Sequence, residues 1–255
     1  MSIKIMSFNL RYDTESDGIN SFTKRFDRVL NTIRTENADI IGFQEVTDSM
    51  RSRVRTALSG EYAFLGCGRD RNYKGEAMLI AYRPELFELI SLESIWLSET
   101  PDVPGSRYYG DHSGCSRMFT VALLKHNDIE APFRFINTHL DHEGANGRYL
   151  EATQLTNVIS KYKEKFVLTG DFNATPDAPE IKLITSALAD KGAIDCTAEL
   201  GPTFHAFGNI PKEKCVKIDY IFTDGKCENA YLVKDTVEGG QYYSDHNAVC
   251  AYIEL

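Results

Sequence analysis

The stretch Gly170-Asp-Phe-Asn173 places a carboxylate and an amide two residues apart, directly after the apolar run Phe166-Val-Leu-Thr169. A short apolar run that ends at Gly and Asp is typical of a buried strand followed by a turn. If the chain stays extended, Asp171 and Asn173 point to one face, because side chains alternate along a strand. Gly170 leaves room for close approach of another group. Taken alone, such a stretch more often forms an Asx turn, so the rest of the chain must decide its meaning.

Other expected strand ends carry side chains of the same kinds. They hold Asn9, then Gln44 and Glu45, then Asn137 and His139 followed by Asp141 and His142, and finally Asp245 and His246. Asp219 lies inside the apolar segment Lys217–Phe222, where an unpaired charge would be costly. Each residue has an alternative interpretation: a helix-start acid for Glu45, a buried ion pair for Asp219, a hydrogen-bonded core histidine for His139, and an ordinary turn for Ser244-Asp-His246. For these residues to be purely structural, all four alternative interpretations would have to be correct at once, which is not expected of a plain β-sandwich.

This combination of side chains suits the hydrolysis of phosphoesters. Acids and amides without a cysteine cluster favour a hard, oxygen-seeking ion such as Mg²⁺ or Mn²⁺, which neutralises negative charge developing on a phosphoryl group. An Asp can hold and activate a water molecule. A His paired with an Asp can stay protonated and donate to a phosphate oxygen.

Two other mechanisms are less well supported by the sequence. A Ser-His-Asp triad has candidate serines, but none lies in a G-x-S-x-G motif. A zinc site could use His139, His142 and His246. The six cysteines form no C-x-x-C pair, so a zinc ribbon or a thioredoxin-type motif has no support.

The pattern of apolar residues predicts the elements that position these side chains. Helical spacing predicts helices over Phe22–Asn37, Thr47–Leu58, Gly144–Lys163 and Pro179–Ala189. Strands are expected at Ser2–Leu10, Asp39–Phe43, Tyr62–Leu65, Glu76–Tyr82, Phe87–Leu97, Met118–Lys125, Pro132–His139, Phe166–Gly170, Val216–Phe222, Tyr231–Lys234 and Tyr243–Leu255. Strands outnumber helices, and helices fall between groups of strands. We therefore expect two packed sheets with helices outside, in one domain over residues 1–255.

Composition limits the classes of partner. The chain has 255 residues, 42% of them hydrophobic, and a net charge of -9. Sequence-independent binding to nucleic acid normally needs a basic face, so we expect no stable nucleic-acid partner. We also expect a monomer. No apolar run reaches membrane-spanning length. No signal peptide is visible, and the compartment stays undetermined.

Six motifs, in order, resemble the endonuclease/exonuclease/phosphatase superfamily over nearly the whole chain, from Ile3 to Leu255. They are Ser7-Phe-Asn9-Leu-Arg11, Gln44-Glu45, Asn137-Thr-His139-Leu-Asp141, Gly170-Asp-Phe-Asn173, Lys217-Ile-Asp219-Tyr-Ile-Phe222 and Ser244-Asp-His246. The fourth and sixth motifs together are highly specific. The resemblance implies a DNase I-like α+β fold, a four-layer α/β/β/α sandwich with the site at one edge of two mixed sheets.

The resemblance also implies a role for each motif residue. Glu45 would be the principal metal ligand, with Asn9 beside it and Asp245 assisting. Asp171 would orient or deprotonate the attacking water, and Asn173 would bind the phosphate. His246, oriented by Asp219, would stabilise the transition state, and His139 would contact the phosphate from the opposite wall.

Arg11 departs from the Asn-x-Asp pattern of the abasic-site nuclease branch, which argues against DNA repair and adds a phosphate-binding cation. The runs around Asn9 and His139 look more like the bacterial branch related to the deadenylase catalytic domain. We therefore expect a metal-dependent phosphoesterase for a small or lipid-derived phosphate ester. The alternatives are a nuclease on short RNA or DNA and an inactive phosphate-binding module.

The sequence does not determine the substrate. We expect specificity to come from the loops Ser98–Arg117 and Pro202–Lys214. Arg117, Arg148 and His205 could line the pocket, but surface or structural roles fit them equally well.

Overall fold

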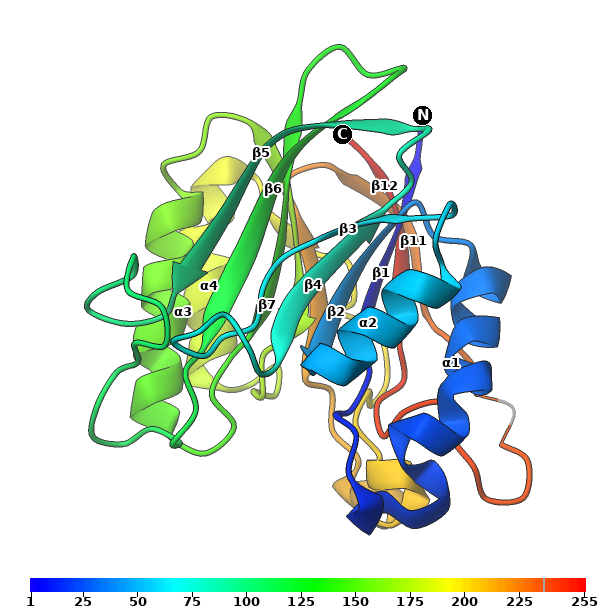
Figure 1. Cartoon of the computed structure of the whole chain (residues 1–255). Coiled ribbons are helices and arrows are strands. Elements are labelled where there is room, and N and C mark those ends of the chain that lie inside the picture. Colours follow the sequence, from blue (N-terminus) through cyan, green and yellow to red (C-terminus); the bar gives the residue numbers. More distant parts are fainter. Residues whose placement is uncertain (236) are drawn as a thin grey trace.

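The computed structural model describes residues 1–235 and 237–255 and has two six-stranded sheets packed face to face (Figure 1). The first sheet has the order β11-β12-β1-β2-β4-β3 and consists of β1 (Ile3–Asn9), β2 (Ile40–Val46), β3 (Ala63–Leu65), β4 (Ala77–Tyr82), β11 (Lys226–Leu232) and β12 (Val249–Glu254). The second sheet has the order β5-β6-β7-β8-β10-β9 and consists of β5 (Phe87–Trp96), β6 (Met118–His126), β7 (Phe133–His139), β8 (Lys165–Asp171), β9 (Ile194–Asp195) and β10 (Asp219–Thr223).

Two α-helices cover the outer face of each sheet (Figure 1). The first sheet carries α1 (Phe22–Glu36) and α2 (Asp48–Ala57), and the second carries α3 (Ala145–Ile159) and α4 (Pro179–Ala187). Short 3₁₀ helices occur in the connections: η1 (Glu15–Asn20), η2 (Ala189–Lys191), η3 (Ala206–Gly208) and η4 (Lys212–Lys214). The predicted four-layer α+β sandwich is confirmed. Among the described residues, no helix has both the length and the apolar character needed to cross a bilayer.

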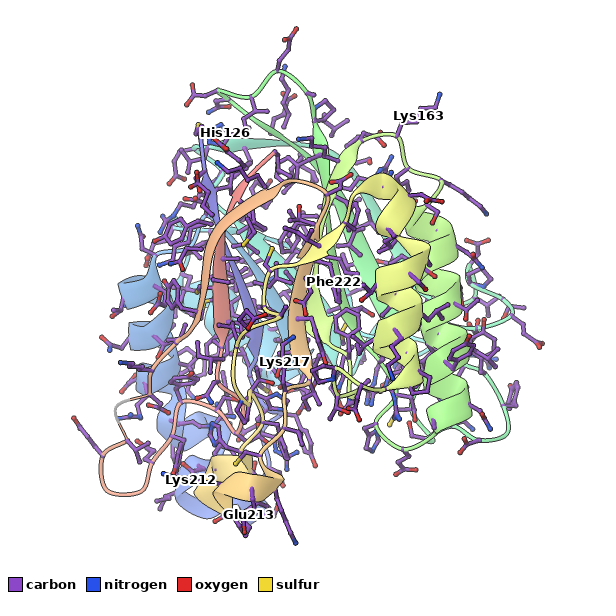
Figure 2. All side chains as sticks on the ribbon, turned by 180° about the vertical axis from the view of Figure 1, so that it is seen from behind. His126, Lys163, Lys212, Glu213, Lys217 and Phe222 are labelled. Atoms are coloured by element: carbon purple, nitrogen blue, oxygen red, sulfur yellow. The ribbon has the colours of Figure 1, made fainter. Side chains whose placement is uncertain are left out.

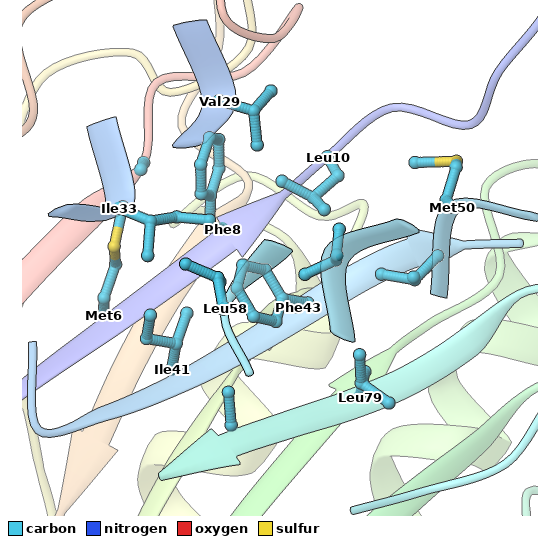
Figure 3. Close-up of a cluster of buried hydrophobic side chains, with 14 of the residues drawn as sticks. Met6, Phe8, Leu10, Val29, Ile33, Ile41, Phe43, Met50, Leu58 and Leu79 are labelled. Carbon is cyan, nitrogen blue, oxygen red and sulfur yellow. The ribbon is translucent and has the colours of Figure 1, made fainter. Parts of the chain in front are cut away.

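Amphipathic spacing explains how the helices pack. In α1, Phe22, Phe26, Val29 and Ile33 recur every three or four residues and are all buried. Figure 3 shows Val29 and Ile33 facing Phe8 of β1. Burying each such side chain contributes roughly 1.5–3 kcal/mol.

A second apolar layer lies between the sheets. It includes Ile5 and Ile40 from the first sheet and Phe135 and Val167 from the second. Along β1, Ile5 faces this inner layer while Met6 and Phe8 belong to the layer under α1 and α2. The strand is therefore buried on both faces, which explains its nearly continuous apolar sequence.

The topology brings the predicted site residues to one edge. Each sheet has one parallel pair, β1 with β2 and β7 with β8, and a helix connects the strands of each pair. Parallel strands end at the same edge, opposite the chain termini at the top of Figure 1. The antiparallel neighbours β10 and β12 begin where β8 and β1 end, so Asp219 pairs directly with Asp171 in the ladder.

Several predicted boundaries differ from the structure. β10 starts at Asp219 rather than Val216, because Val216 pairs with Phe204 in a separate bridge. β12 starts at Val249, because the residues before it leave the ladder. The edge strand β11 begins earlier than predicted, since three of its seven residues, all among the first four, are exposed and polar and give no apolar signal.

Candidate active site

The predicted site residues surround one cleft of about 610 Å³ at this edge. It is lined by Arg11, Glu45, His139, Asp171, Asn173, Asp245 and His246, and Asn9 and Asp219 lie directly behind them. The connection between β9 and β10 forms another wall through Phe204, Ala206 and Phe207. Figure 2 places Lys212 and Glu213 of this connection at the end of the molecule opposite to His126 and Lys163.

Asn9 holds two carboxylates from different sheets side by side. Its amide Nδ2 donates to Glu45 Oε1 at 3.0 Å and to Asp171 Oδ2 at 2.9 Å. Its Oδ1 accepts from the Arg11 backbone N–H at 2.8 Å. Only 1% of Asn9 is exposed, so water does not compete strongly for these bonds. Asn9 therefore sets the spacing of the two acids.

A β-bulge turns Glu45 into the cleft. The β2–β4 register shifts between Phe43 and Val46, and Glu45 has a positive φ of 62°. Glu45 Oε2 accepts from the Tyr12 N–H at 2.9 Å, which stabilises this orientation. The neighbouring Gln44 points between the sheets instead.

Unusual backbone conformations concentrate at the cleft. Seven non-glycine residues among those described have a positive φ, and five of them line it: Arg11, Glu45, Asn173, Ala206 and Phe207. Such conformations cost roughly 1–3 kcal/mol each and persist where surrounding contacts enforce them. Their concentration here is typical of a functional site.

Asp171 and Asn173 lie together, although the chain between them does not stay extended. Asn173 adopts φ 47°, and its backbone N–H donates to Asp171 Oδ1 at 2.9 Å, so an Asx turn closes β8. This turn brings Asn173 Nδ2 within 3.0 Å of His139 Nε2 and 3.1 Å of the Leu140 carbonyl. A Cβ at Gly170 would meet the Thr138 carbonyl at 2.5 Å, which explains the glycine there. The Asx turn and the polar site coexist.

His246 is buried between two carboxylates. Its Nδ1 lies 2.8 Å from Asp219 Oδ2, and its Nε2 lies 3.7 Å from Asp171 Oδ2. Burial alone would lower the pKa of His246, but Asp219 and Asp171 outweigh it and raise the pKa well above the ordinary value. The Thr203 hydroxyl accepts from the Asp219 N–H and fixes the start of β10. His246 is therefore an imidazolium at neutral pH.

The acids of the cleft have different proton affinities. Burial, with the charge of Asp219 next, raises the pKa of Asp171 to about 7. Burial and the charge of Glu45 also raise the pKa of Asp245. For Glu45 burial acts in the same direction, but hydrogen bonds from Asn9 and Tyr12 outweigh it and lower the pKa. The lowered pKa favours the ionised form of Glu45, whereas Asp171, with a pKa of about 7, can exchange a proton near neutral pH.

His139 differs in charge from His246. Burial and the nearby guanidiniums of Arg117 and Arg69 lower the pKa of His139 well below the ordinary value. The neutral ring can accept from Asn173 Nδ2, while its buried Nδ1 has no partner among the described residues. The cleft therefore places a neutral and a charged imidazole on either side of Asp171.

The donor set fits a divalent cation. Glu45 and Asp171 place carboxylate oxygens within 4.8 Å of each other, close enough to hold a metal ion between them. His246 lies equally close, but its imidazolium form is not a metal ligand. Asp245 lines the same cleft, and its Oδ2 lies 3.9 Å from Arg11 Nε. Burial is the main cause that raises the pKa values of Asp171 and Asp245, and the charges of Asp219 and Glu45 respectively add to it; a bound cation would offset this repulsion between carboxylates.

Gln44 and Asn137 do not reach the cleft, although both stand beside site residues in the sequence. Gln44 Nε2 donates to Asn137 Oδ1 at 2.7 Å, and Asn137 Nδ2 donates to the Phe43 and Leu79 carbonyls. A Cβ at Gly42 would lie 2.7 Å from Asn137 Oδ1, so glycine makes room for this pair. These two amides join the sheets behind the site.

Arg25 is a supporting residue that sequence reasoning missed. Its fully buried guanidinium donates to the backbone carbonyls of Asn20, Leu10, Arg11 and Tyr243. The segments that carry Arg11 and Ser244-Asp-His246 are thereby tied to one side chain. The amphipathic pattern of α1 does not predict this role of Arg25, because the guanidinium binds backbone carbonyls outside the helix.

Three further basic residues that could line the pocket on sequence grounds, Arg117, Arg148 and His205, lie in different places. Arg117 lines the cleft, together with Arg69, which was not predicted. Arg148 lies outside it and pairs with Glu180 at 2.9 Å. His205 packs on Tyr242, with ring centroids 5.1 Å apart, and does not line the cleft.

Comparison with known proteins agrees with this geometry. An endonuclease/exonuclease/phosphatase from Bacteroides vulgatus is 32% identical, with a TM-score of 0.91 over 100% of this chain and 99% of that chain. A mannosyl-6-phosphatase from Bacteroides thetaiotaomicron is 25% identical, with a TM-score of 0.88 over 100% of both chains. The uncharacterized protein L388 of Acanthamoeba polyphaga mimivirus is 26% identical over 182 residues, which are 67% of each chain. The sequence also matches the Endonuclease/Exonuclease/phosphatase family over residues 6–246, so this chain belongs to that family of metal-dependent phosphoesterases and nucleases.

Proposed function

We propose that this protein is a divalent-metal-dependent phosphoesterase that hydrolyses a small phosphate ester by in-line attack of water. The observation that carries the proposal is the arrangement of Asp219, His246, Asp171, Asn173 and His139 along the cleft. Adjacent members of this series lie between 2.8 and 3.7 Å apart. The protonated imidazole of His246 and the neutral imidazole of His139 flank the titratable carboxylate of Asp171. Among the described residues that line the cleft there is no serine, so a covalent seryl mechanism has no support.

Asp171 is the proposed general base. Its two oxygens accept from Asn9 Nδ2 and the Asn173 N–H, which fixes the direction of the remaining lone pairs. A pKa of about 7 matches a group that takes a proton from water at neutral pH. Asp171 also orients the water for attack on phosphorus.

The histidines and Asn173 bind the phosphate on either side of this water. His246 is held as an imidazolium by Asp219 and donates through Nε2 to a phosphate oxygen, so its charge offsets the charge that develops during the reaction. Asn173 Nδ2 donates to His139 Nε2 and to the Leu140 carbonyl in this structure, and one of these N–H groups would turn to another phosphate oxygen when substrate binds. His139, next to Asn173, would contact the same phosphate. Arg11, held in a bidentate pair by Asp17, adds positive charge nearby.

Glu45 is the proposed principal metal ligand, with Asn9 beside it and Asp245 assisting. Oxygen donors favour Mg²⁺ or Mn²⁺. When bound, such an ion supplies Lewis-acid stabilisation of the phosphoryl group. Glu45 suits this role because its carboxylate stays ionised and is fixed by two hydrogen bonds.

A small substrate is favoured over a nucleic acid. Five carboxylates line the cleft, namely Asp17, Glu45, Glu76, Asp171 and Asp245, and the chain carries a net charge of -9. Such a surface repels a polyanion whose backbone extends beyond the cleft. The similarity to a mannosyl-6-phosphatase over the full length of both chains supports a phosphomonoester of a small polar molecule.

The test compares wild type with Asp171→Asn in hydrolysis of p-nitrophenyl phosphate and bis(p-nitrophenyl) phosphate, with Mg²⁺, Mn²⁺ or EDTA. We expect wild-type turnover that requires metal and prefers the monoester. Metal-dependent cleavage of a short oligonucleotide in preference to both compounds would favour the nuclease alternative. Failure to turn over these compounds and a panel of phosphate esters would favour a phosphate-binding module.

A further inference from the structure

Two arginines of the cleft are buried without enough hydrogen-bond acceptors. Arg117 is only 2% exposed and Arg69 only 7%, yet both line the cleft. Arg117 precedes β6 of the second sheet, whereas Arg69 lies between β3 and β4 of the first. The sandwich edge therefore brings together two guanidiniums that are 48 positions apart in the chain (117 − 69).

The hydrogen bonds of these arginines leave donors free. Arg117 Nη2 donates to His142 Nδ1 at 2.9 Å, and this is its single side-chain partner within residues 1–235 and 237–255. Its Nε and Nη1 have no acceptor, and neither has Arg69 Nη1. Arg69 Nη2 pairs with Glu76 Oε1 at 2.7 Å. Three guanidinium nitrogens are thus desolvated without compensation, an arrangement that destabilises a fold unless something else requires it.

Three other buried or half-buried arginines, Arg25, Arg11 and Arg148, are well supplied with acceptors. Arg25 donates to four backbone carbonyls. Arg11 makes a bidentate pair with Asp17, and Arg148 binds Glu180 and the Asp141 carbonyl. Arg117 and Arg69 both lie next to His139, and their charges lower the pKa of its ring.

We propose that Arg117 and Arg69 bind a second phosphate group of the substrate, so that the preferred substrate is a small molecule with two phosphates. This inference rests on the proposed function, in which the scissile phosphate lies between Asp171, Asn173 and His246. The three nitrogens without an acceptor are shielded from solvent, so the two side chains would turn towards the cleft to bring their N–H groups to a terminal phosphate. Guanidinium forks bind phosphate in a bidentate manner. Arg117 and Arg69 are thus specificity-determining residues rather than part of the hydrolytic machinery.

The first test measures binding without turnover. Calorimetry in EDTA compares inorganic pyrophosphate with orthophosphate for wild type, Arg117→Gln and the exposed control Arg55→Gln. We expect Arg117→Gln to weaken pyrophosphate binding by about tenfold to hundredfold, the scale of a lost charge-assisted hydrogen bond, with little change for orthophosphate. Equal losses for both ions would assign Arg117 to the scissile phosphate and overturn the proposal.

The second test separates a ligand-binding role from a structural one. Removing an uncompensated buried charge should raise the melting temperature of ligand-free Arg117→Gln, or leave it unchanged, relative to wild type. A clear fall, or failure to fold, would mean that Arg117 supports the structure and would contradict the proposal. Arg117→Lys keeps the charge but loses the fork, and should bind pyrophosphate with an affinity between wild type and Arg117→Gln; full wild-type affinity would contradict bidentate recognition.

A kinetic arm distinguishes this inference from the proposed function. With Mg²⁺, wild type should have a lower KM for glucose 1,6-bisphosphate than for glucose 6-phosphate, and Arg117→Gln should bring the two KM values closer together. Because Arg117 also lowers the pKa of His139, the readout is the ratio of the two KM values, and a change of kcat shared by both substrates does not bear on the inference. If neither glucose phosphate is hydrolysed while pyrophosphate binding still depends on Arg117, the proposed function is contradicted and the anion site is supported. If hydrolysis occurs without any preference for the bisphosphate, this inference falls and the proposed function stands.

Discussion

Two clusters in this molecule are built from the same residue types yet differ in what they can do. The cleft cluster consists of Glu45, Asp171 and His246, and the buried cluster consists of His112, Asp141 and Glu151. In each, ligand atoms of one histidine and two acids lie within 4.8 Å of one another. The cleft cluster lines the cleft, whereas no member of the buried cluster does.

The buried cluster has its hydrogen bonds satisfied inside the fold. Asp141 accepts from the Ser113 hydroxyl and backbone N–H and from the N–H groups of Glu143 and Gly144. His112 Nε2 lies 2.7 Å from Glu151, and its Nδ1 lies 2.7 Å from the Ser113 carbonyl. These bonds fix the loop before α3. Few lone pairs remain for a ligand.

The cleft cluster keeps unused lone pairs and repelling charges. Each oxygen of Asp171 accepts one hydrogen bond, and His246 Nε2 has only Asp171 near it, at 3.7 Å. The same residue types thus form a structural support where protein donors saturate them, and a reactive site where they face open space. Matched substitutions in the two clusters test this difference.

Asp171→Asn should give the largest effect, because it removes the proposed base. We expect kcat to fall by about a hundredfold or more. Asp141→Asn in the buried cluster should leave kcat of the folded protein nearly unchanged. Steady-state hydrolysis of p-nitrophenyl phosphate at saturating Mg²⁺ measures both. Near-normal turnover by Asp171→Asn would mean that another group activates the water.

Asp219→Asn should lower kcat by about tenfold and change its pH dependence. Asp219 raises the pKa of His246, so wild type should stay active into the alkaline range. Without that charge the pKa of His246 falls, and the alkaline loss of activity should move to lower pH. A pH–rate profile of both proteins measures the shift. An unmoved alkaline limb would argue against a protonated His246.

Glu45→Gln should raise the Mg²⁺ concentration needed for half-maximal activity by about tenfold. The substitution keeps the shape of the side chain but removes the ionised ligand. Glu151→Gln, its counterpart in the buried cluster, should leave the metal dependence unchanged. Titration of activity with Mg²⁺ compares the two variants. If neither titration moved, the principal ligand would have to lie elsewhere.

Asp141→Asn should change stability rather than activity. Burial opposes ionisation of Asp141, but hydrogen bonds from Ser113 and the backbone lower its pKa from 3.8 to about 2. A lowered pKa stabilises the folded state above the unfolded value, and this contribution is lost as pH falls through the folded value. The variant should therefore be less stable by about 2 kcal/mol at neutral pH and equal to wild type near pH 2. Urea unfolding at several pH values measures the difference; a constant difference down to pH 2 would contradict this linkage.

Much of the fold could be predicted from local patterns. The spacing of Val29 and Ile33 predicts which face of α1 is buried, and the apolar run before Asp171 predicts β8. Short edge strands such as β9 were not predicted, because two residues carry no periodicity. The start of β12 was predicted too early, since residues 243–248 are held by loop contacts that alternation does not report.

For the candidate site, residue types alone could not separate neighbours in one motif. Asn137 and His139 lie two apart, but Asn137 joins the sheets and His139 lines the cleft. Asp141 belongs to the same run and lies in the buried cluster. Arg69 has no motif around it, and its place is evident only because the two sheets meet beside His139.

The sequence by itself determined the strand and helix pattern, the family motifs and the presence of acids, amides and imidazoles at strand ends. These depend on spacing over a few residues, which periodicity records. Only the tertiary structure decided which of those groups are saturated and which remain free. Asn9 and Asp171 are 162 positions apart, and Arg117 receives its acceptor from a different strand connection. Hydrogen-bond saturation and burial depend on such distant contacts, and they separate a reactive group from a structural one.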